Sequence, residues 1–256
     1  PLVNLRVFAS VLFTSAAAVA SILGAALFGS TYLVPLFVQT VQHYTPLAAG
    51  LLLMPAGLIM GIVMPIGGYL SDRIPARGMI IVGILFLGAS SFWLASVDAN
   101  MPFWTIAWCV LLSRIGFGLI KAPLNVAALR ALRPELLGQG AGMINFARQM
   151  GGAFGVNTLS VILDRRTFFH SDALTELQTS ANSATLDLLR NVQILLAQAG
   201  VPPDLQSPGA LHYLGRVIYA QAYTMGFRDS FLISAVVFTF ALIPAWIMGR
   251  TKASYG

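Results

Sequence analysis

GGYLSDRIPAR, residues 67–77, is a short charged turn between two apolar stretches of the chain. No Asp, Glu, Lys or Arg occurs from residue 7 to residue 71, and Asp72, Arg73 and Arg77 then follow close together. A charged side chain at bilayer depth costs about 2.5–3.5 kcal/mol on translocon scales. The turn therefore predicts that the chain returns from a membrane to water at this point.

The composition is that of a polytopic membrane protein. Hydrophobic residues make up 57% of the 256 residues and charged residues only 9%, whereas a soluble domain carries about 25% charged residues. The net charge of +6 comes largely from loop arginines, so it indicates membrane topology and no nucleic-acid partner. The first residue is Pro1 rather than Met, and we expect the chain to be a piece of a longer protein.

Six segments are apolar over about 20 residues, the length that a spanning helix needs. They are residues 14–39, 46–70, 78–97, 102–124, 139–164 and 228–249. The fifth is the least regular, because it contains Asn145, Arg148, Gln149 and Asn157. The sequence therefore predicts an all-α fold, a six-transmembrane-helix bundle formed by residues 1–256 as one unit.

Basic residues gather on one side of this arrangement. The connectors near 71–77 and 125–138 carry arginines, whereas those at 40–45 and 98–101 carry no Lys or Arg. Basic residues also flank the bundle, with Arg6 before the first span and Arg250 and Lys252 after the last. Positive-inside counting places both ends and the 71–77 turn in the cytoplasm, with Arg165 and Arg166 as exceptions beside a long connector.

That connector, residues 167–227, is expected to be an extracytoplasmic loop with some helix. Residues 183–199 have the apolar stripe of an amphipathic helix, and the VPPD sequence at 201–204 ends it. Residues 209–226 predict a second helix lying at the membrane surface. A simple lid and a docking surface for another protein are both compatible with this pattern.

Several segments carry a family resemblance in the right order. They are residues 32–39 (YLVPLFVQ), 45–50 (TPLAAG), 53–55 (LMP), 67–73 (GGYLSDR), 114–118 (RIGFG), 123–124 (PL) and 145–155 (NFARQMGGAFG). Together they resemble the fourteen-helix EmrB/QacA-type drug:proton antiporters of the major facilitator superfamily. The chain departs from the usual loop signature at Pro75, where glycine is common, and at Gly78, where a second basic residue is usual.

The resemblance implies that this chain is the C-terminal six-helix bundle and that eight N-terminal helices are absent. It implies alternating access between the two halves of one chain, driven by the proton gradient with no cofactor. Its further implied partners are the lipid bilayer, lipophilic small molecules and, in some relatives, a periplasmic adaptor protein bound at the 167–227 connector.

The loop residues Gly68, Asp72, Arg73 and Arg77 are candidates for a gating latch. The family loop is thought to hold the cytoplasmic side of one transport state closed, and Asp72 could pair with arginines or a helix N-terminus. The alternative is a plain positive-inside anchor, which would not need the aspartate.

Ionisable residues inside the spans are candidates for the substrate or coupling pathway. Arg114 lies about 18 Å along its span, at 1.5 Å per residue, so we expect it to face the bundle interior or a wet cavity. Lys121 shares its face, and Arg148 with Asn145 and Gln149 occupies a comparable depth in the fifth span. A structural hydrogen-bond hub that ties helices together is the alternative role.

One helix face combines Phe28, Tyr32 and Gln39, spaced as a single stripe. By the resemblance, the first and fourth helices line the central cavity, where this stripe would suit a lipophilic substrate through stacking and cation–π contact. Ordinary helix packing is the alternative. The glycine pairs Gly57/Gly61 and Gly151/Gly155 are small-xxx-small motifs, expected to pack against the absent half.

No Asp or Glu lies in the interior of any predicted span, so a proton-binding carboxylate is expected in the absent half. The three histidines show no metal-ligand spacing, and no catalytic motif is present, so we expect a transporter and not an enzyme. The predicted function is proton-coupled export of lipophilic, often cationic, compounds across the bacterial inner membrane. A carrier of another solute (a siderophore, sugar or amino acid derivative) and a six-helix channel or pump subunit are the alternatives.

Overall fold

The computed structural model describes residues 8, 10–130, 132–179 and 182–250. Two of the basic residues used to predict the cytoplasmic ends, Arg6 and Lys252, lie outside these residues.

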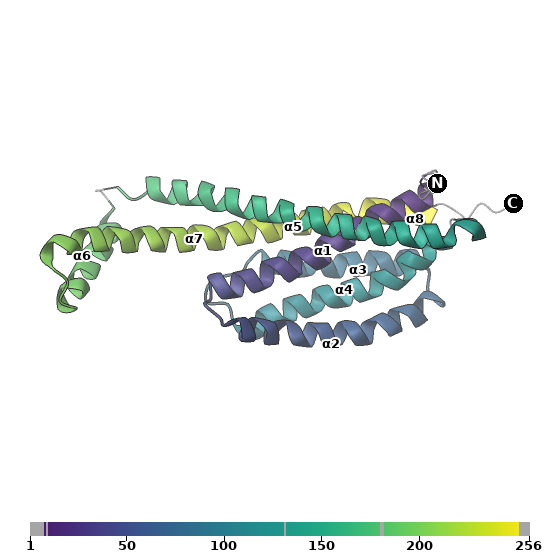
Figure 1. Cartoon of the computed structure of the whole chain (residues 1–256), viewed down its shortest axis with the longest axis horizontal. Coiled ribbons are helices and arrows are strands. Elements are labelled where there is room, and N and C mark those ends of the chain that lie inside the picture. The colour runs from purple at the N-terminus through teal and green to yellow at the C-terminus, as the bar shows by residue number, and fades with distance from the viewer. Residues whose placement is uncertain (1–7, 9, 131, 180–181, 251–256) are drawn as a thin grey trace.

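The described part of the chain is helical and contains no β-strand, so the predicted all-α fold class is confirmed. The helices are α1 (Val11–Thr40), α2 (Pro46–Ser71), α3 (Ala76–Leu94), α4 (Phe103–Arg130), a 3₁₀ turn (Pro134–Leu136), α5 (Leu137–Glu176), α6 (Ser183–Gln198), α7 (Pro203–Phe240) and α8 (Leu242–Arg250). Helices α1 to α4 lie roughly parallel in one bundle, and α5 and α7 run along it and project beyond it (Figure 1). We call the projecting part, residues 167–227, the arm.

Five helical stretches are long and apolar enough to cross a membrane: α1, α2, α3, α4 and the stretch Pro203–Met248, which contains α7 and most of α8. The predicted fifth span, now part of α5, does not reach the same hydropathy because its polar residues interrupt the apolar run. It nevertheless packs along α1 and α7 like the other members of the bundle (Figure 1).

Local sequence signals explain where the first two helices begin. The Ser10 hydroxyl accepts a hydrogen bond from the Phe13 backbone N–H, and the Thr45 hydroxyl accepts one from Ala48. Both are N-cap interactions that satisfy free N–H groups in the first turn. Pro46 then occupies the first turn of α2, where its missing N–H costs nothing.

The connector at 167–227 is more helical than the sequence predicts. Helix α5 continues to Glu176, and residues 209–226 are not a separate helix but the middle of α7, which continues directly into the bundle. No Gly or Pro interrupts residues 156–176, so the helix has no local reason to stop where the apolar run ends. The amphipathic helix expected at 183–199 is confirmed as α6.

The last predicted span, 228–249, is divided between α7 and α8 at Ala241. Pro244 explains the break, because its ring has no N–H and would clash with the carbonyl of Phe240, four residues earlier.

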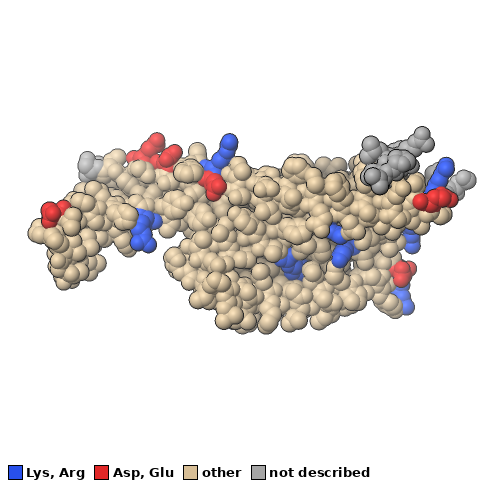
Figure 2. Space-filling model, in the orientation of Figure 1, with Lys and Arg blue, Asp and Glu red and all other residues tan. Residues whose placement is uncertain are grey.

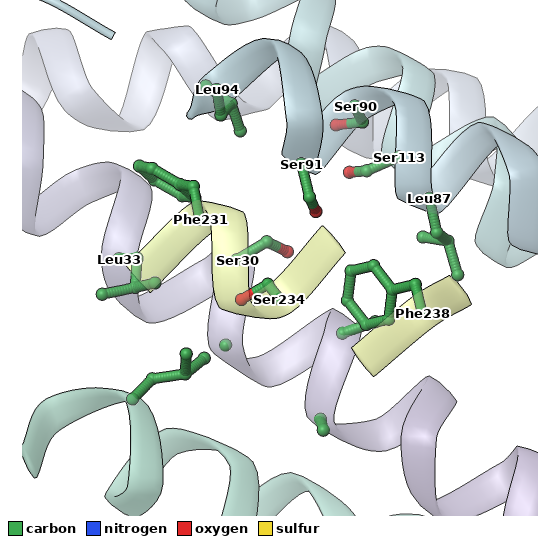
Figure 3. A pocket seen from close by; sticks show the side chains of 14 residues that line it. Ser30, Leu33, Leu87, Ser90, Ser91, Leu94, Ser113, Phe231, Ser234 and Phe238 are labelled. Atoms are coloured by element: carbon green, nitrogen blue, oxygen red, sulfur yellow. The ribbon is translucent and has the colours of Figure 1, made fainter. Parts of the chain in front are cut away.

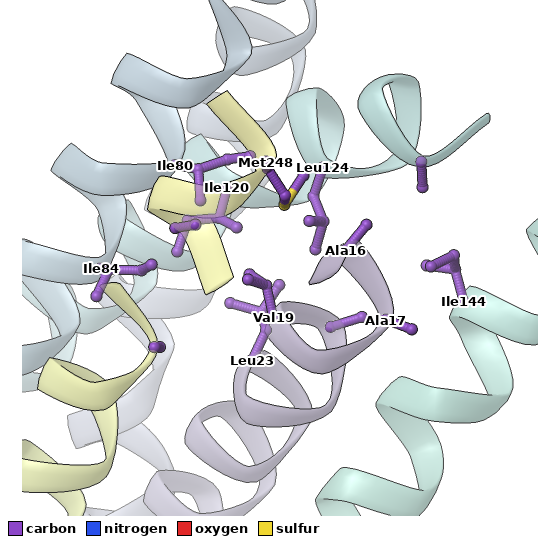
Figure 4. Packing of buried hydrophobic residues seen from close by; sticks show 14 of the residues in the cluster. Ala16, Ala17, Val19, Leu23, Ile80, Ile84, Ile120, Leu124, Ile144 and Met248 are labelled. Atoms are coloured by element: carbon purple, nitrogen blue, oxygen red, sulfur yellow. The ribbon is translucent and has the colours of Figure 1, made fainter. Parts of the chain in front are cut away.

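The buried side chains form two clusters, one toward each end of the bundle. In the cluster shown in Figure 4, side chains of α1, α3, α4, α5 and α8 interdigitate around Leu23, Ile84 and Ile120. Helix α4 lies in the middle of the bundle because its glycines allow close approach on two sides. A Cβ atom at Gly116 would lie 2.6 Å from the Gly83 carbonyl oxygen of α3, and one at Gly67 of α2 would lie 2.8 Å from the Gly118 carbonyl oxygen.

Charged side chains gather at the two ends of the molecule and along the arm; the rest of the bundle face in view is uncharged except for a few basic side chains (Figure 2). This distribution fits a bundle surrounded by lipid with both ends in water.

Candidate functional site

The charged turn connects α2 to α3. Helix α2 ends at Ser71 with Asp72 as its C-cap, and Asp72 is exposed and belongs to no ion pair among the described residues. The two arginines lie over aromatic rings, Arg73 at 4.4 Å from the centre of Tyr69 and Arg77 at 3.9 Å from that of Trp246. The predicted pairing of Asp72 with these arginines is therefore not seen; cation–π contacts hold the arginines to α2 and α8 instead.

Glycines shape the approach to this turn. Gly68 faces open space, and its carbonyl oxygen accepts a hydrogen bond from the Ser71 hydroxyl at 2.6 Å. The neighbouring Gly67 makes the close contact with α4 described above. Gly67 therefore fixes the C-terminal end of α2 against α4, and Gly68 and Asp72 remain free for another contact.

Arg114 is buried within the bundle, with only 8% of its surface exposed. Its Nη2 donates a hydrogen bond to the Thr31 hydroxyl of α1 at 2.8 Å, so it links α4 to α1. No carboxylate pairs with it among the described residues. A buried guanidinium with a single neutral partner is costly, so its position is of functional interest.

Two further cations, on α4 and α5, lie close enough for their charges to interact. Lys121 is partly buried and experiences the positive charge of Arg148. Arg148 Nη2 donates a hydrogen bond to Asn145 Oδ1 on its own helix, and Gln149 is exposed beside it. The structure thus brings together Lys121, Arg148 and Asn145 and places Arg114 separately, against α1.

The aromatic stripe of α1 lies against α5 over much of its length. A Cβ atom at Gly152 would lie 2.2 Å from the Phe28 ring, and the Tyr32 hydroxyl donates a hydrogen bond to the Ser160 hydroxyl at 3.3 Å. Gln39, at the end of the stripe, is partly exposed. Phe28 and Tyr32 therefore contribute to packing between α1 and α5. Phe28 is also partly exposed, so part of its ring is accessible to a ligand.

The two glycine pairs have different surroundings. Cβ atoms at Gly151 and Gly155 would lie 2.1 Å from the Ser21 carbonyl oxygen and 2.6 Å from Ala25 Cβ, so this pair packs against α1 of the same bundle and not against an absent half. Gly57 and Gly61 on α2 have no atom within 4 Å of such a Cβ. They belong to an open apolar face of α2, the least buried of the candidate spans.

A small cavity lies inside the bundle, between α1, α3, α4, α5 and α7, and its lining is mostly apolar (Figure 3). Its volume is about 20 Å³, enough for one water molecule. Its polar lining consists of Ser30, Ser90, Ser91, Ser113 and Ser234. Four of these hydroxyls donate to backbone carbonyls, whereas Ser91, buried, makes no side-chain hydrogen bond within the described chain. These serines were not singled out from the sequence, because isolated serines in apolar helices form no motif.

Sequence reasoning also missed an ionic cluster at the base of the arm. Asp229 Oδ2 on α7 accepts hydrogen bonds from Arg166 Nε at 2.5 Å and from His170 Nε2 at 2.7 Å, both on α5. These are the two salt bridges of the described residues. Only the pairing of α5 with α7 brings these residues together, and nothing in their sequence separation indicates it.

At the same end of the bundle, side chains of α7 and of the turn after α1 donate hydrogen bonds to the backbone of the loop between α3 and α4. Gln42 Nε2 donates to the carbonyl oxygens of Met101 at 2.8 Å and Ala99 at 3.3 Å, and Arg228 Nε donates to that of Val97 at 2.6 Å. The ends of α1, α3, α4 and α7 are thereby joined at the base of the arm.

The comparisons with known proteins agree with this architecture. Residues 1–156 match the model of the Major Facilitator Superfamily. The chain is 27% identical over its full length to the multidrug resistance protein B homolog of Mycobacterium tuberculosis, and covers 46% of that protein. It is 26% identical, over 96% of its length, to the multidrug export protein EmrB of Escherichia coli, and covers 47% of it. The chain thus spans about half the length of the curated relatives that it matches.

A solved structure shows the same fold. Residues of this chain superpose on a bacterial homologue of the human lysosomal transporter Spinster, in an inward-facing, unoccupied conformation, with a TM-score of 0.63 and 16% identity. The match covers 98% of this chain and 50% of that one. The resemblance to EmrB-type transporters is confirmed, and the channel and pump-subunit alternatives lose their support. The chain is an integral membrane protein and belongs to the Major Facilitator Superfamily, a family of transporters and not of enzymes.

Proposed function

We propose that this chain is the C-terminal half of a multidrug exporter that exchanges lipophilic, often cationic, compounds for protons by alternating access. The observation that carries the proposal is the set of intramembrane cations Arg114, Lys121 and Arg148, none of which has a carboxylate partner among the described residues. Such residues are expensive in a bilayer and mark transport pathways. Proton-binding carboxylates in the other half of the protein would complete the site and be tuned by these charges.

The open face of α2 supports a two-halved transporter. Leu51, Met54 and Leu58 are exposed there, beside Gly57 and Gly61. Small residues on a membrane helix allow another helix to approach closely, so the N-terminal half is our proposed partner for this face.

The proposed orientation in the bacterial inner membrane follows from the basic connectors. The 71–77 turn and the 125–138 connector would be cytoplasmic, and the arm would project to the other side. In this orientation, Asp72 and Gly68 are free to contact the N-terminal half when the cytoplasmic side closes, and the arm is available to a periplasmic adaptor. Proton-driven transport requires no cofactor.

The test is efflux of ethidium from cells that express the full-length protein. We expect export that an uncoupler of the proton gradient abolishes, and loss of most of the rate in Arg114→Ala and Asp72→Asn at matched expression. Arg130→Ala is the control, because Arg130 is exposed at the end of the same helix as Arg114 and Arg133 still anchors that connector.

Two results would contradict the proposal. Export that persists without a proton gradient would remove the antiport mechanism. If well-inserted parent protein moves no dye from a panel of lipophilic cations, the drug assignment fails, and a carrier of another solute becomes the better description.

A further inference from the structure

A groove of about 800 Å³ opens where the arm leaves the bundle. One wall is the end of α1 and the following turn, with Thr40, Val41 and His43. The other wall is the arm portion of α7, residues 212–223. In Figure 1 this is the corner between the end of α1 and the projecting part of α7.

The groove carries one formal positive charge, that of Arg216. Its other titratable lining residues are His43, His212 and the tyrosines, and no Asp or Glu lines it, although Asp164 of α5 lies close enough to Tyr223 for their charges to interact. Arg216 is exposed and pairs with no carboxylate in the part of the chain that the structure describes. Such a guanidinium presents several N–H donors to an oxyanion, and its planar fork matches the geometry of a phosphate or a carboxylate.

An aromatic ladder continues from the groove into the bundle. Tyr219 stacks on Tyr223 with 5.8 Å between ring centres, and Tyr223 meets Phe227 edge-on at 4.9 Å. Phe227 in turn contacts Phe37 of α1, inside the bundle. The floor of the groove is thus apolar below its charged rim, so a matching ligand has an anionic head and an apolar body.

The position of the groove indicates where such a ligand would come from. Thr40 is the last residue of α1, a candidate membrane span. Gln42, two residues later, donates a hydrogen bond to the loop between α3 and α4, so this turn lies at the end of the bundle. The groove therefore lies beside the end of a candidate span on the side of the arm, where we expect the membrane–water interface, the level at which tyrosines are enriched in membrane proteins. Basic residues at this level attract anionic lipids.

We propose that this groove binds an anionic phospholipid from the leaflet on the side of the arm. Arg216, with His212 and His43, receives the phosphate, and the upper acyl chains lie along Tyr219 and Tyr223. The apolar floor favours a lipid over free phosphate, and the cationic rim favours an anionic over a zwitterionic headgroup. The proposal does not depend on which solute the protein transports.

The test uses the full-length protein, purified in detergent and mixed with phosphatidylglycerol or phosphatidylcholine, with bound lipid counted by native mass spectrometry. We expect the parent to retain phosphatidylglycerol over phosphatidylcholine, and the double variant Arg216→Ala/His212→Ala to bind it about tenfold more weakly. Arg190→Ala is the matched control, because Arg190 is an exposed arginine of the arm on α6 that does not line the groove. Tyr219→Ala is expected to weaken binding of both lipids.

A second measurement guards against misfolded variants. Phosphatidylglycerol is expected to raise the thermal stability of the parent and of Arg190→Ala, and not that of the double variant, whose stability without lipid should match the parent. Equal retention of lipid by parent and double variant would overturn the proposal, as would equal retention of the two lipids. Displacement of the lipid by millimolar inorganic phosphate would show an anion site without an acyl-chain component.

Discussion

Replacement of Gly116 by Ala tests whether close backbone contact holds α3 against α4. The new Cβ would lie 2.6 Å from the Gly83 carbonyl oxygen and 3.0 Å from Phe86 Cβ. A backbone oxygen cannot rotate away as a side chain can, so the two helices must separate. Overpacking of this kind costs about 1–3 kcal/mol, and Ala regains up to about 1 kcal/mol over Gly in a helix. When a gain of about 1 kcal/mol is subtracted, we expect a net loss of up to about 2 kcal/mol relative to the parent.

The assay is unfolding of the purified full-length protein by increasing SDS, followed by tryptophan fluorescence. Gly88→Ala is the control: it lies on α3 like Gly83, but its Cβ would have no atom within 4 Å, so its unfolding midpoint should equal or exceed that of the parent. Gly83→Ala should resemble Gly116→Ala, and the double variant should lose less than the sum, because both changes disrupt one contact. A Gly116→Ala protein as stable as Gly88→Ala would refute the reasoning.

Three other predictions concern polar contacts. Gln42→Ala should cost about 1 kcal/mol and accelerate amide exchange at residues 98–101, since the carboxamide donates to the backbone of that loop; unchanged exchange would count against the contact. Thr31→Val removes the hydroxyl that accepts from Arg114 and should cost about 1–3 kcal/mol in the same SDS assay, whereas Thr31→Ser should be nearly neutral. Asp229→Asn should cost at most about 1 kcal/mol, because the cluster is partly exposed, but should make the base of the arm easier to cleave with protease; equal cleavage of parent and variant would contradict this role.

The apolar helices could be predicted from hydropathy because burial in lipid imposes a length and a composition on each of them. The expected spans 14–39 and 46–70 lie within α1 and α2, and the span 102–124 begins one residue before α4. The charged turn at 71–77 joins the end of α2 to the start of α3, as its charges require. The charge pattern was informative for the same reason, since an ionisable residue at depth has few permitted environments. Arg114 illustrates this. Its place near the middle of a predicted span required a site that is buried in the bundle or hydrated, and the structure shows it buried.

The lengths of α5 and α7 could not be predicted in the same way. Hydropathy marks where a helix leaves the lipid and not where the helix ends. The end of α5 at Glu176 and the start of α7 at Pro203 therefore cannot be found from the apolar pattern. The helices persist beyond the apolar segments because α5 and α7 pack on each other and α7 also packs on α6. The sequence also does not show which glycines contact a neighbouring helix. Gly57 and Gly151 lie in the same kind of motif, but Gly57 faces open space and Gly151 packs against α1.

The arm also explains the exception to the positive-inside pattern. Arg166 lies on the side that should carry few basic residues, but its guanidinium is bound by Asp229 and lies 4.8 Å from the centre of the Phe169 ring. A tertiary contact between α5 and α7 therefore accounts for its position, independently of topology. The rule has least force beside long connectors, and this residue is followed by a helical arm and not by a short loop. The arginines of the 71–77 turn and of the 125–138 connector thus remain the better guide to the proposed orientation.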